Sequence, residues 1–193
     1  MSRKRDHGYG KSTNTNQNTS IEISPNESFL NKIIEILKIV ITTNESVSQQ
    51  EKNITKKISL FSSNKIPSIS LKDYLYRIAY YTEAEEATFI IALIYIDRLN
   101  KYGLILNSYN IHRIIFVAIL IAIKFNEDNC FDFNYYSAIA GISTKELKIL
   151  EIEFINLIKF ELFVKKEEYL KYKIDLDDNN DDDEEEEEDE DDI

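Results

Sequence analysis

The chain has 193 residues, of which 35 are acidic and 23 basic, with one Cys, two Pro, four Gly and no Trp. That length fits one domain with appended segments, and a lone Cys130 excludes an internal disulfide and favours a reducing compartment. The first residues lack the apolar core of a signal peptide, and the longest apolar run, Ile114 to Ile123, is much shorter than the about 20 residues of a membrane span. We therefore expect a protein of the cytoplasm, the nucleus or both, with no membrane contact.

The negative charge is concentrated near the end of the sequence. Residues 175–192 hold 15 Asp or Glu and no Lys or Arg, which leaves 20 acidic and 23 basic residues elsewhere. Like charges repel and cannot bury apolar area, so we expect a disordered, solvated tail over 175–193. The alternative is an acidic arm that binds basic partners or folds back on the basic segment 3–11. The nearly neutral remainder argues against direct nucleic-acid binding.

Residues 1–23 are polar, which predicts a disordered arm. Its basic run at 3–5 fits a weak nuclear-import signal or an ordinary solvated terminus. The next segment, 24–65, is predicted to hold one helix and a connector. Apolar residues recur at helical spacing over 27–41, and Ser24, Pro25 and Glu27 fit a cap, a first helical position and a capping box. The pair Ser24–Pro25 also fits a phosphorylation site, but the helix start alone explains it.

Five further helices are indicated after Pro67, most of them preceded by a capping residue. They are 71–81 after Ser70, 83–102 after Thr82, 109–125 after Asn107 or Ser108, 134–141, and 144–160 after Ser143. Gly103 fits the stop of the second one. Because 109–125 is apolar on every face, it is predicted to lie at the centre. The predicted fold class is all-α, with five helices around a central buried helix and an N-terminal helix before them.

Motifs of catalysis and of cofactor binding are missing. The sequence has no Cys-x-x-Cys, no HExxH, no glycine-rich phosphate loop and no G-x-S-x-G elbow, and its two His are His7 and His112. We expect no metal and no cofactor. An enzyme is the least favoured class.

Four ionisable residues interrupt strongly apolar stretches. They are Arg77, Asp97, Lys124 and Glu151. An unpaired charge in such a place costs several kcal/mol, so each needs a partner. Two charges of each sign permit two internal pairs. The alternative is that all four reach solvent at helix edges, as Lys does beyond an apolar stem.

Helical geometry groups two of these charges with apolar neighbours. One group lies within a sector of about 100° of the central helix, and the other within a sector of about 40° of the last helix. The two groups are Ile121, Lys124 and Phe125, and Glu151, Ile155 and Leu162, the last only if its helix persists that far. Together they would form a groove with a donor and an acceptor. Such a groove suits a helix end, whose free amides and carbonyls Lys and Glu can satisfy.

Segment 66–162 resembles a cyclin box, most closely the single-box phosphate-pathway and plant U-type (P/U) group. The stretches that carry the resemblance are IPSISLKDYLYRIAYY, YIDRL, LNSYNIHR, IKFNED, NYYSAIAGISTKELKILE and FINLIKFEL. Their order and spacing match the family's. A short extension, 163–174, would separate the box from the acidic tail.

The resemblance implies a non-catalytic subunit that binds and activates a cyclin-dependent kinase, in division timing or a nutrient response. It assigns Lys124 and Glu151 to the kinase's regulatory C helix, with apolar contacts from Ile121, Phe125, Ile155 and Leu162. It also implies that Arg77 and Asp97 form an internal ion pair. The alternative function is a cyclin-box scaffold for a non-kinase partner, such as a transcription complex.

Overall fold

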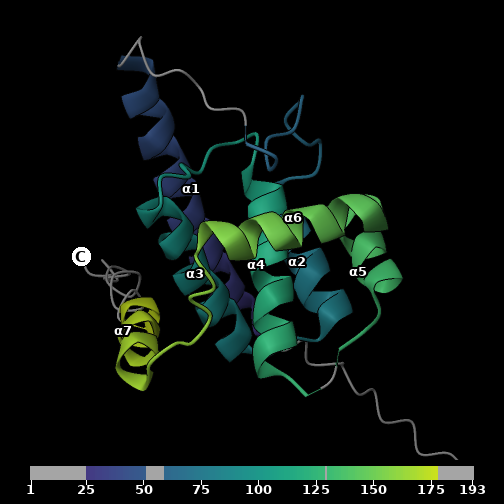
Figure 1. The fold of residues 1–193 in the computed structure, drawn as a ribbon. Coiled ribbons are helices and arrows are strands. Elements are labelled where there is room, and N and C mark those ends of the chain that lie inside the picture. The colour runs from purple at the N-terminus through teal and green to yellow at the C-terminus, as the bar shows by residue number, and fades with distance from the viewer. Residues whose placement is uncertain (1–24, 51–58, 129, 178–193) are drawn as a thin grey trace, which may run out of the picture.

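The computed structural model describes residues 25–50, 59–128 and 130–177, and these ranges are built from seven α-helices without a strand (Figure 1). The helices are α1 (Glu27–Gln50), α2 (Leu71–Thr82), α3 (Glu86–Lys101), α4 (Ile111–Asn126), α5 (Phe133–Ala140), α6 (Thr144–Leu157) and α7 (Lys166–Asp177). The all-α prediction is confirmed. Each helix of these ranges is too short or too polar to cross a membrane.

Helix α4 is the centre of the fold. Its ten residues Ile114 to Ile123 are each at most 3% exposed, as an all-apolar helix must be to escape water. Helices α2, α3, α5 and α6 pack directly against it, while α1 packs on α2 and α7 packs on both α3 and α1. Figure 1 shows α6 crossing α4 near the middle of the molecule.

Several helix ends lie where the sequence predicts them. The hydroxyls of Ser70 and Ser143 accept hydrogen bonds from backbone amides three residues later, at 3.0 and 3.1 Å. Gly103 stops α3 at a φ of 91°, a left-handed conformation that glycine adopts without strain. The next amide, of Leu104, donates to the Leu99 carbonyl at 3.1 Å and completes the helix stop.

Three predicted helix starts are wrong. Helix α1 is capped by Asn26, whose side chain accepts from the Phe29 amide at 2.8 Å, so Pro25 precedes the helix, and Ser24 lies outside the described residues. Thr82 belongs to α2 and donates back to a carbonyl of its own helix, so it does not cap α3. Helix α4 begins after Asn110 rather than after Asn107 or Ser108.

Two helices run further than the sequence indicates. Helix α1 continues to Gln50, past the predicted end at 41. In this additional part of the helix, Glu45 accepts a hydrogen bond from the Ser108 amide at 2.8 Å, which connects the polar half of α1 to the segment before α4. Helix α7 was not predicted, and it includes residues 175–177 of the expected disordered tail. Its Leu176 is buried, and the Leu176 carbonyl accepts from Lys32 of α1 at 2.9 Å.

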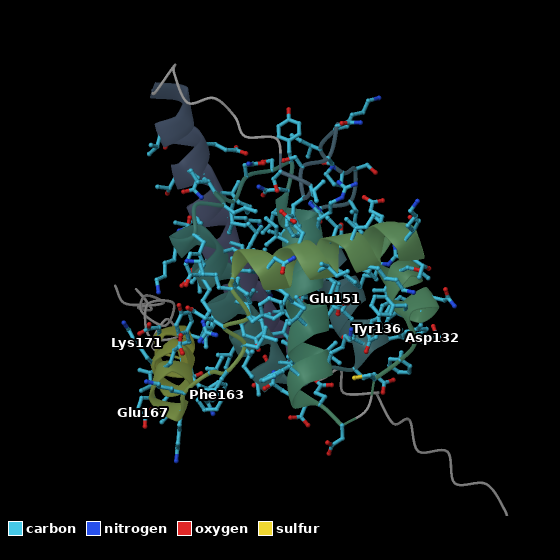
Figure 2. The ribbon with its side chains drawn as sticks, viewed as in Figure 1. Asp132, Tyr136, Glu151, Phe163, Glu167 and Lys171 are labelled. Carbon is cyan, nitrogen blue, oxygen red and sulfur yellow. The ribbon has the colours of Figure 1, made fainter. Side chains whose placement is uncertain are left out.

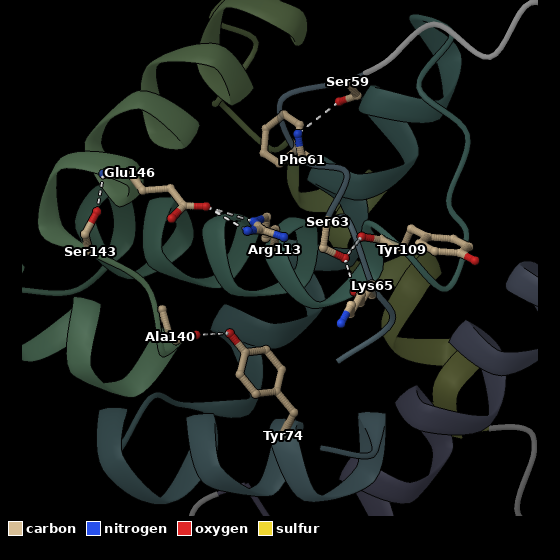
Figure 3. A network of polar contacts seen from close by, with 10 residues as sticks. All are labelled: Ser59, Phe61, Ser63, Lys65, Tyr74, Tyr109, Arg113, Ala140, Ser143 and Glu146. Atoms are coloured by element: carbon tan, nitrogen blue, oxygen red, sulfur yellow. Dashed lines mark hydrogen bonds and ion pairs between the residues drawn. The ribbon is translucent and has the colours of Figure 1, made fainter. Parts of the chain in front are cut away.

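The N-terminal half of α4 is fixed by polar contacts to its neighbours (Figure 3). Arg113 pairs with Glu146 of α6 at 2.8 Å. The Tyr74 hydroxyl of α2 donates to the Ala140 carbonyl at the end of α5 at 3.2 Å. Ser63 donates to the Tyr109 carbonyl at 2.7 Å and attaches the connector before α2. The first contact joins α4 to α6, the second joins α2 to α5, and the third fixes the segment that precedes α4.

Candidate functional site

The centre of the candidate site is an ion pair between the last turn of α4 and the middle of α6. Lys124 Nζ lies 2.5 Å from Glu151 Oε1, so the structure joins two charges that the sequence grouped with apolar residues on separate helices. The Glu151 side chain is only 11% exposed, whereas that of Lys124 is 38% exposed. Figure 2 shows Glu151 on α6 where this helix crosses α4. The ammonium group can therefore still donate to an incoming group.

An aromatic ring supports this pair from the side of α5. Lys124 Nζ lies 4.7 Å from the centroid of the Phe133 ring, and Lys148 of α6 lies 5.2 Å from it. Cations over a ring face are attracted by its quadrupole. The ring thus positions both Lys124 and Lys148, and Lys148 lies one helical turn before Glu151.

Exposed apolar side chains lie beside the ion pair. Phe125 follows Lys124 and is 52% exposed, and Ile152 follows Glu151 and is 61% exposed. We call this surface the α4–α6 face, and it consists of Lys124, Phe125, Glu151, Ile152, Ile155 and Phe160. Of the predicted contacts, Phe125 and the half-buried Ile155 lie on it, while Ile121 is 3% exposed and supports the face from below.

The predicted helix over 144–160 is too long, so the condition that would place Leu162 in the sector of Glu151 is not met. The helix ends at Leu157, and Lys159 and Phe160 adopt left-handed φ angles of 54° and 60°. Such angles are unusual for bulky residues and cost of order 1–3 kcal/mol each, so surrounding contacts must hold them. The turn brings the Phe160 amide to the Ile155 carbonyl at 3.0 Å and leaves the Phe160 ring 69% exposed. Leu162 is displaced from the helical sector.

The segment after this turn is held by α3. The Leu162 carbonyl accepts from the Tyr95 hydroxyl at 2.8 Å, and Arg98 donates to the carbonyls of Glu161 and Phe163. Burial raises the pKa of the Tyr95 hydroxyl, which keeps it a donor. Arg98 also pairs with Glu168 of α7 at 2.8 Å. We call these contacts the α3 brace.

The predicted ion pair between Arg77 and Asp97 is absent. Arg77 is exposed and donates to the Ala138 carbonyl of α5 at 2.7 Å. Asp97 accepts from the Tyr172 hydroxyl of α7, and burial together with this contact raises the pKa of Tyr172. The internal charge of this region is Arg98, one position later on α3. The resemblance pointed to Asp97 instead, because the partners of Arg98 lie after the predicted helix 144–160, in a stretch for which the sequence indicated no structure.

The chain resembles known proteins over most of its length. The family model described as Cyclin matches residues 12–162. The chain is 34% identical to Cyclin-U4-2 of Arabidopsis thaliana over 158 residues, which cover 81% of this chain and 72% of that protein. It is 32% identical to PHO85 cyclin-7 of Saccharomyces cerevisiae over 184 residues, covering 82% of this chain and 65% of the yeast protein.

The chain belongs to the cyclin family. It also shares 32% identity with Cyclin-P4-1 of Oryza sativa, over 60% of this chain and 55% of the rice protein. Together with its similarity to plant U-type cyclins and to a PHO85 cyclin, this makes it a P/U-type cyclin. A cyclin is a regulatory subunit of a cyclin-dependent kinase and does no chemistry itself.

Sequence reasoning missed two contributors to the α4–α6 face. Ile152 occupies a position at the border between the buried and the polar sides of its helix, so periodicity did not assign it to a surface. Phe160 was predicted to lie at the end of a helix rather than in a turn. The only available signal was the choice of large apolar residues beside Glu151 and soon after the buried Ile158. In the described part of this cyclin, no group of three His, Cys, Asp or Glu side chains could hold a metal ion.

Proposed function

We propose that the α4–α6 face binds the regulatory C helix of a cyclin-dependent kinase and thereby activates the kinase. The observation that carries the proposal is the Lys124–Glu151 ion pair, which lies among exposed Phe125, Ile152 and Phe160. Exposed apolar side chains of this kind are stabilised when a partner covers them. Lys124 retains donors and Glu151 retains an oxygen for the free backbone groups of a helix end.

Activation follows from differential binding. The cyclin can shift the kinase equilibrium only by binding the active arrangement more tightly than the inactive one. Docking of the C helix in its inward position would favour the Lys–Glu ion pair of the kinase that phosphoryl transfer requires. The same account explains why the cyclin needs no catalytic group of its own.

The test is affinity capture of the tagged cyclin from its own cell lysate, followed by a protein-kinase assay on the captured material. Lys124→Ala/Glu151→Ala is captured in parallel, with Lys173→Ala/Glu167→Ala on the exposed surface of α7 as the matched control. We expect kinase activity with the wild type and the control, and its loss with the face variant. Equal activity from all three proteins would contradict the proposal.

The alternative is a scaffold in which the same face binds a non-kinase partner. It predicts that a well-folded wild-type protein recovers a partner through the α4–α6 face without any kinase activity. Circular dichroism on the same preparations establishes that the helices are intact. The capture experiment therefore separates the two functions directly.

The place and process of action are part of the proposal. Cys130 is exposed and unpaired, which suits a reducing compartment, so we propose the cytoplasm, the nucleus or both. We propose that the kinase complex serves division timing or a nutrient response. Imaging of a fluorescent fusion tests the first statement. Following protein abundance through a synchronised division and through a nutrient shift distinguishes the two processes.

A further inference from the structure

Four aromatic side chains gather at the surface between the end of α2 and the start of α5. They are Tyr80, Tyr81, Phe131 and Tyr135, and each is between 37% and 53% exposed. The Tyr80 and Tyr81 ring centroids lie 5.0 Å apart, and those of Phe131 and Tyr135 lie 4.4 Å apart. The Tyr135 hydroxyl donates to the Tyr81 carbonyl at 2.8 Å and joins the two pairs. We call this surface the aromatic patch; exposed apolar surface of this kind marks an interaction site.

The chain around the aromatic patch is acidic. Segments 80–88 and 125–135 contain six Asp or Glu and no Lys or Arg. Glu127 is fixed beside α3 by the Thr88 hydroxyl at 2.5 Å, and Asp132 caps α5 through the Tyr135 amide. The three ion pairs within the described ranges involve none of these carboxylates. Their charge is therefore available to a cationic partner, whose Lys or Arg side chains also favour aromatic ring faces.

A basic segment of the same chain is attached next to this surface. The described structure begins at Pro25. The side-chain amide of the next residue, Asn26, donates to Glu86 Oε1 at 3.1 Å. Residues 3–11, RKRDHGYGK, carry four Lys or Arg and one Asp. The chain between Lys11 and Asn26 reaches up to about 50 Å when extended. Tyr81 is five positions from Glu86, the contact of Asn26, so the two lie within about 18 Å of each other. The basic segment can therefore reach the aromatic patch. A short tether of this kind gives an effective concentration in the millimolar range.

We propose that the basic segment 3–11 binds the aromatic patch of its own molecule. Its Lys and Arg side chains lie over the tyrosine and phenylalanine rings and beside the carboxylates at the patch rim. The contact depends on exposed charges, so it weakens as salt shortens the Debye length.

The only cysteine of the chain provides a probe at the right place. Cys130 is exposed and precedes Phe131, so a nitroxide attached to it broadens the amide signals of any segment bound to the patch. In the full chain we expect residues 3–11 to lose more signal intensity than residues 13–18, although the latter are nearer to Asn26 along the chain. Glu83→Lys/Asp128→Lys should abolish that excess loss, and so should 0.5 M salt, a concentration at which the Debye length is well under about 8 Å.

The matched control is Glu167→Lys, an exposed charge reversal on α7, which Figure 2 shows on the opposite side of the molecule from Asp132. It should leave the broadening unchanged. Intensities that recover smoothly from Asn26 towards residue 3 would overturn the proposal. A second result would also overturn the proposal. In it, the excess loss of signal intensity at residues 3–11 remains in Glu83→Lys/Asp128→Lys but disappears when residues 178–193 are removed. That result would show pairing of the two chain ends instead.

Discussion

The α4–α6 face and the α3 brace are both organised around a cation, but they use it differently. Arg98 of the brace directs its guanidinium to two backbone carbonyls and to Glu168, and its side chain is 12% exposed. Lys124 of the face has one carboxylate partner and stays more than one-third exposed. A mostly buried cation that bridges several internal acceptors holds the fold together, whereas one left partly open beside exposed apolar residues is available to a partner.

The largest effect is expected from breaking the brace. Arg98→Ala should lower the free energy of unfolding by about 2–5 kcal/mol, because it strands the carbonyls of Glu161 and Phe163 and leaves Glu168 unpaired. Urea unfolding followed by circular dichroism measures the change. Arg113→Ala removes a more exposed ion pair to Glu146 and should cost about 1 kcal/mol or less. Similar losses for the two variants would contradict the distinction.

A second prediction concerns the exposed ring of the face. Phe160→Ala should leave the unfolding free energy within about 0.5 kcal/mol but weaken kinase binding by about 1–3 kcal/mol. Phe163→Ala is the control, because this ring is equally exposed in the same segment, and Figure 2 places it towards α7. Surface plasmon resonance with the captured kinase compares the two. Equal weakening by both variants would show that the binding surface extends to α7.

A third prediction tests the corrected pairing of α2 and α3. Arg77→Ala and Asp97→Ala should each cost about 0.5–1.5 kcal/mol of stability, the usual value of one hydrogen bond. Since the two side chains contact different helices, their effects should add within about 0.5 kcal/mol. Asp97→Ala combined with Tyr172→Phe should instead be non-additive. A strong coupling between Arg77 and Asp97 would restore the ion pair that the resemblance implied.

The smallest expected effect is a pH dependence from His112. Burial lowers the pKa of His112, while its contact with the Ile69 carbonyl opposes the shift. The folded state therefore binds fewer protons than the unfolded state, and stability is lost as pH falls below about 6.5. His112→Gln should flatten the difference in unfolding free energy between pH 7.5 and 5.5. His7→Gln, the other histidine, should follow the wild type; the reverse pattern would contradict the assignment.

The sequence predicts those parts of the fold that local chemistry determines. Ser70, Ser143 and Gly103 mark helix ends through short-range hydrogen bonds and backbone freedom, and the apolar run through α4 requires burial on all sides. Helical geometry grouped Lys124 and Glu151 each with the apolar residues on its own helix, and the cyclin resemblance assigned both to one surface. For these features the information lies within a few residues of the chain.

The remaining features depend on contacts between distant segments. The end of α6 is set by left-handed Lys159 and Phe160, neither of which signals a turn, and it is held in place by Arg98 from α3. Helix α7 has a weakly amphipathic sequence and is stabilised through Glu168 and Leu176. Because these partners are 63 to 144 positions away in sequence, periodicity could not reveal them.

The most direct test of the central claim is the dissociation constant of the partner kinase for the wild type and for Lys124→Ala, Glu151→Ala and the double variant. We expect each single change to weaken binding by about 2–5 kcal/mol, because it leaves buried polar groups of the complex unpaired. The double variant should be less than additive, since the two side chains act as one unit. Unchanged affinity in the double variant, with its helices intact, would contradict the assignment of the α4–α6 face to the kinase.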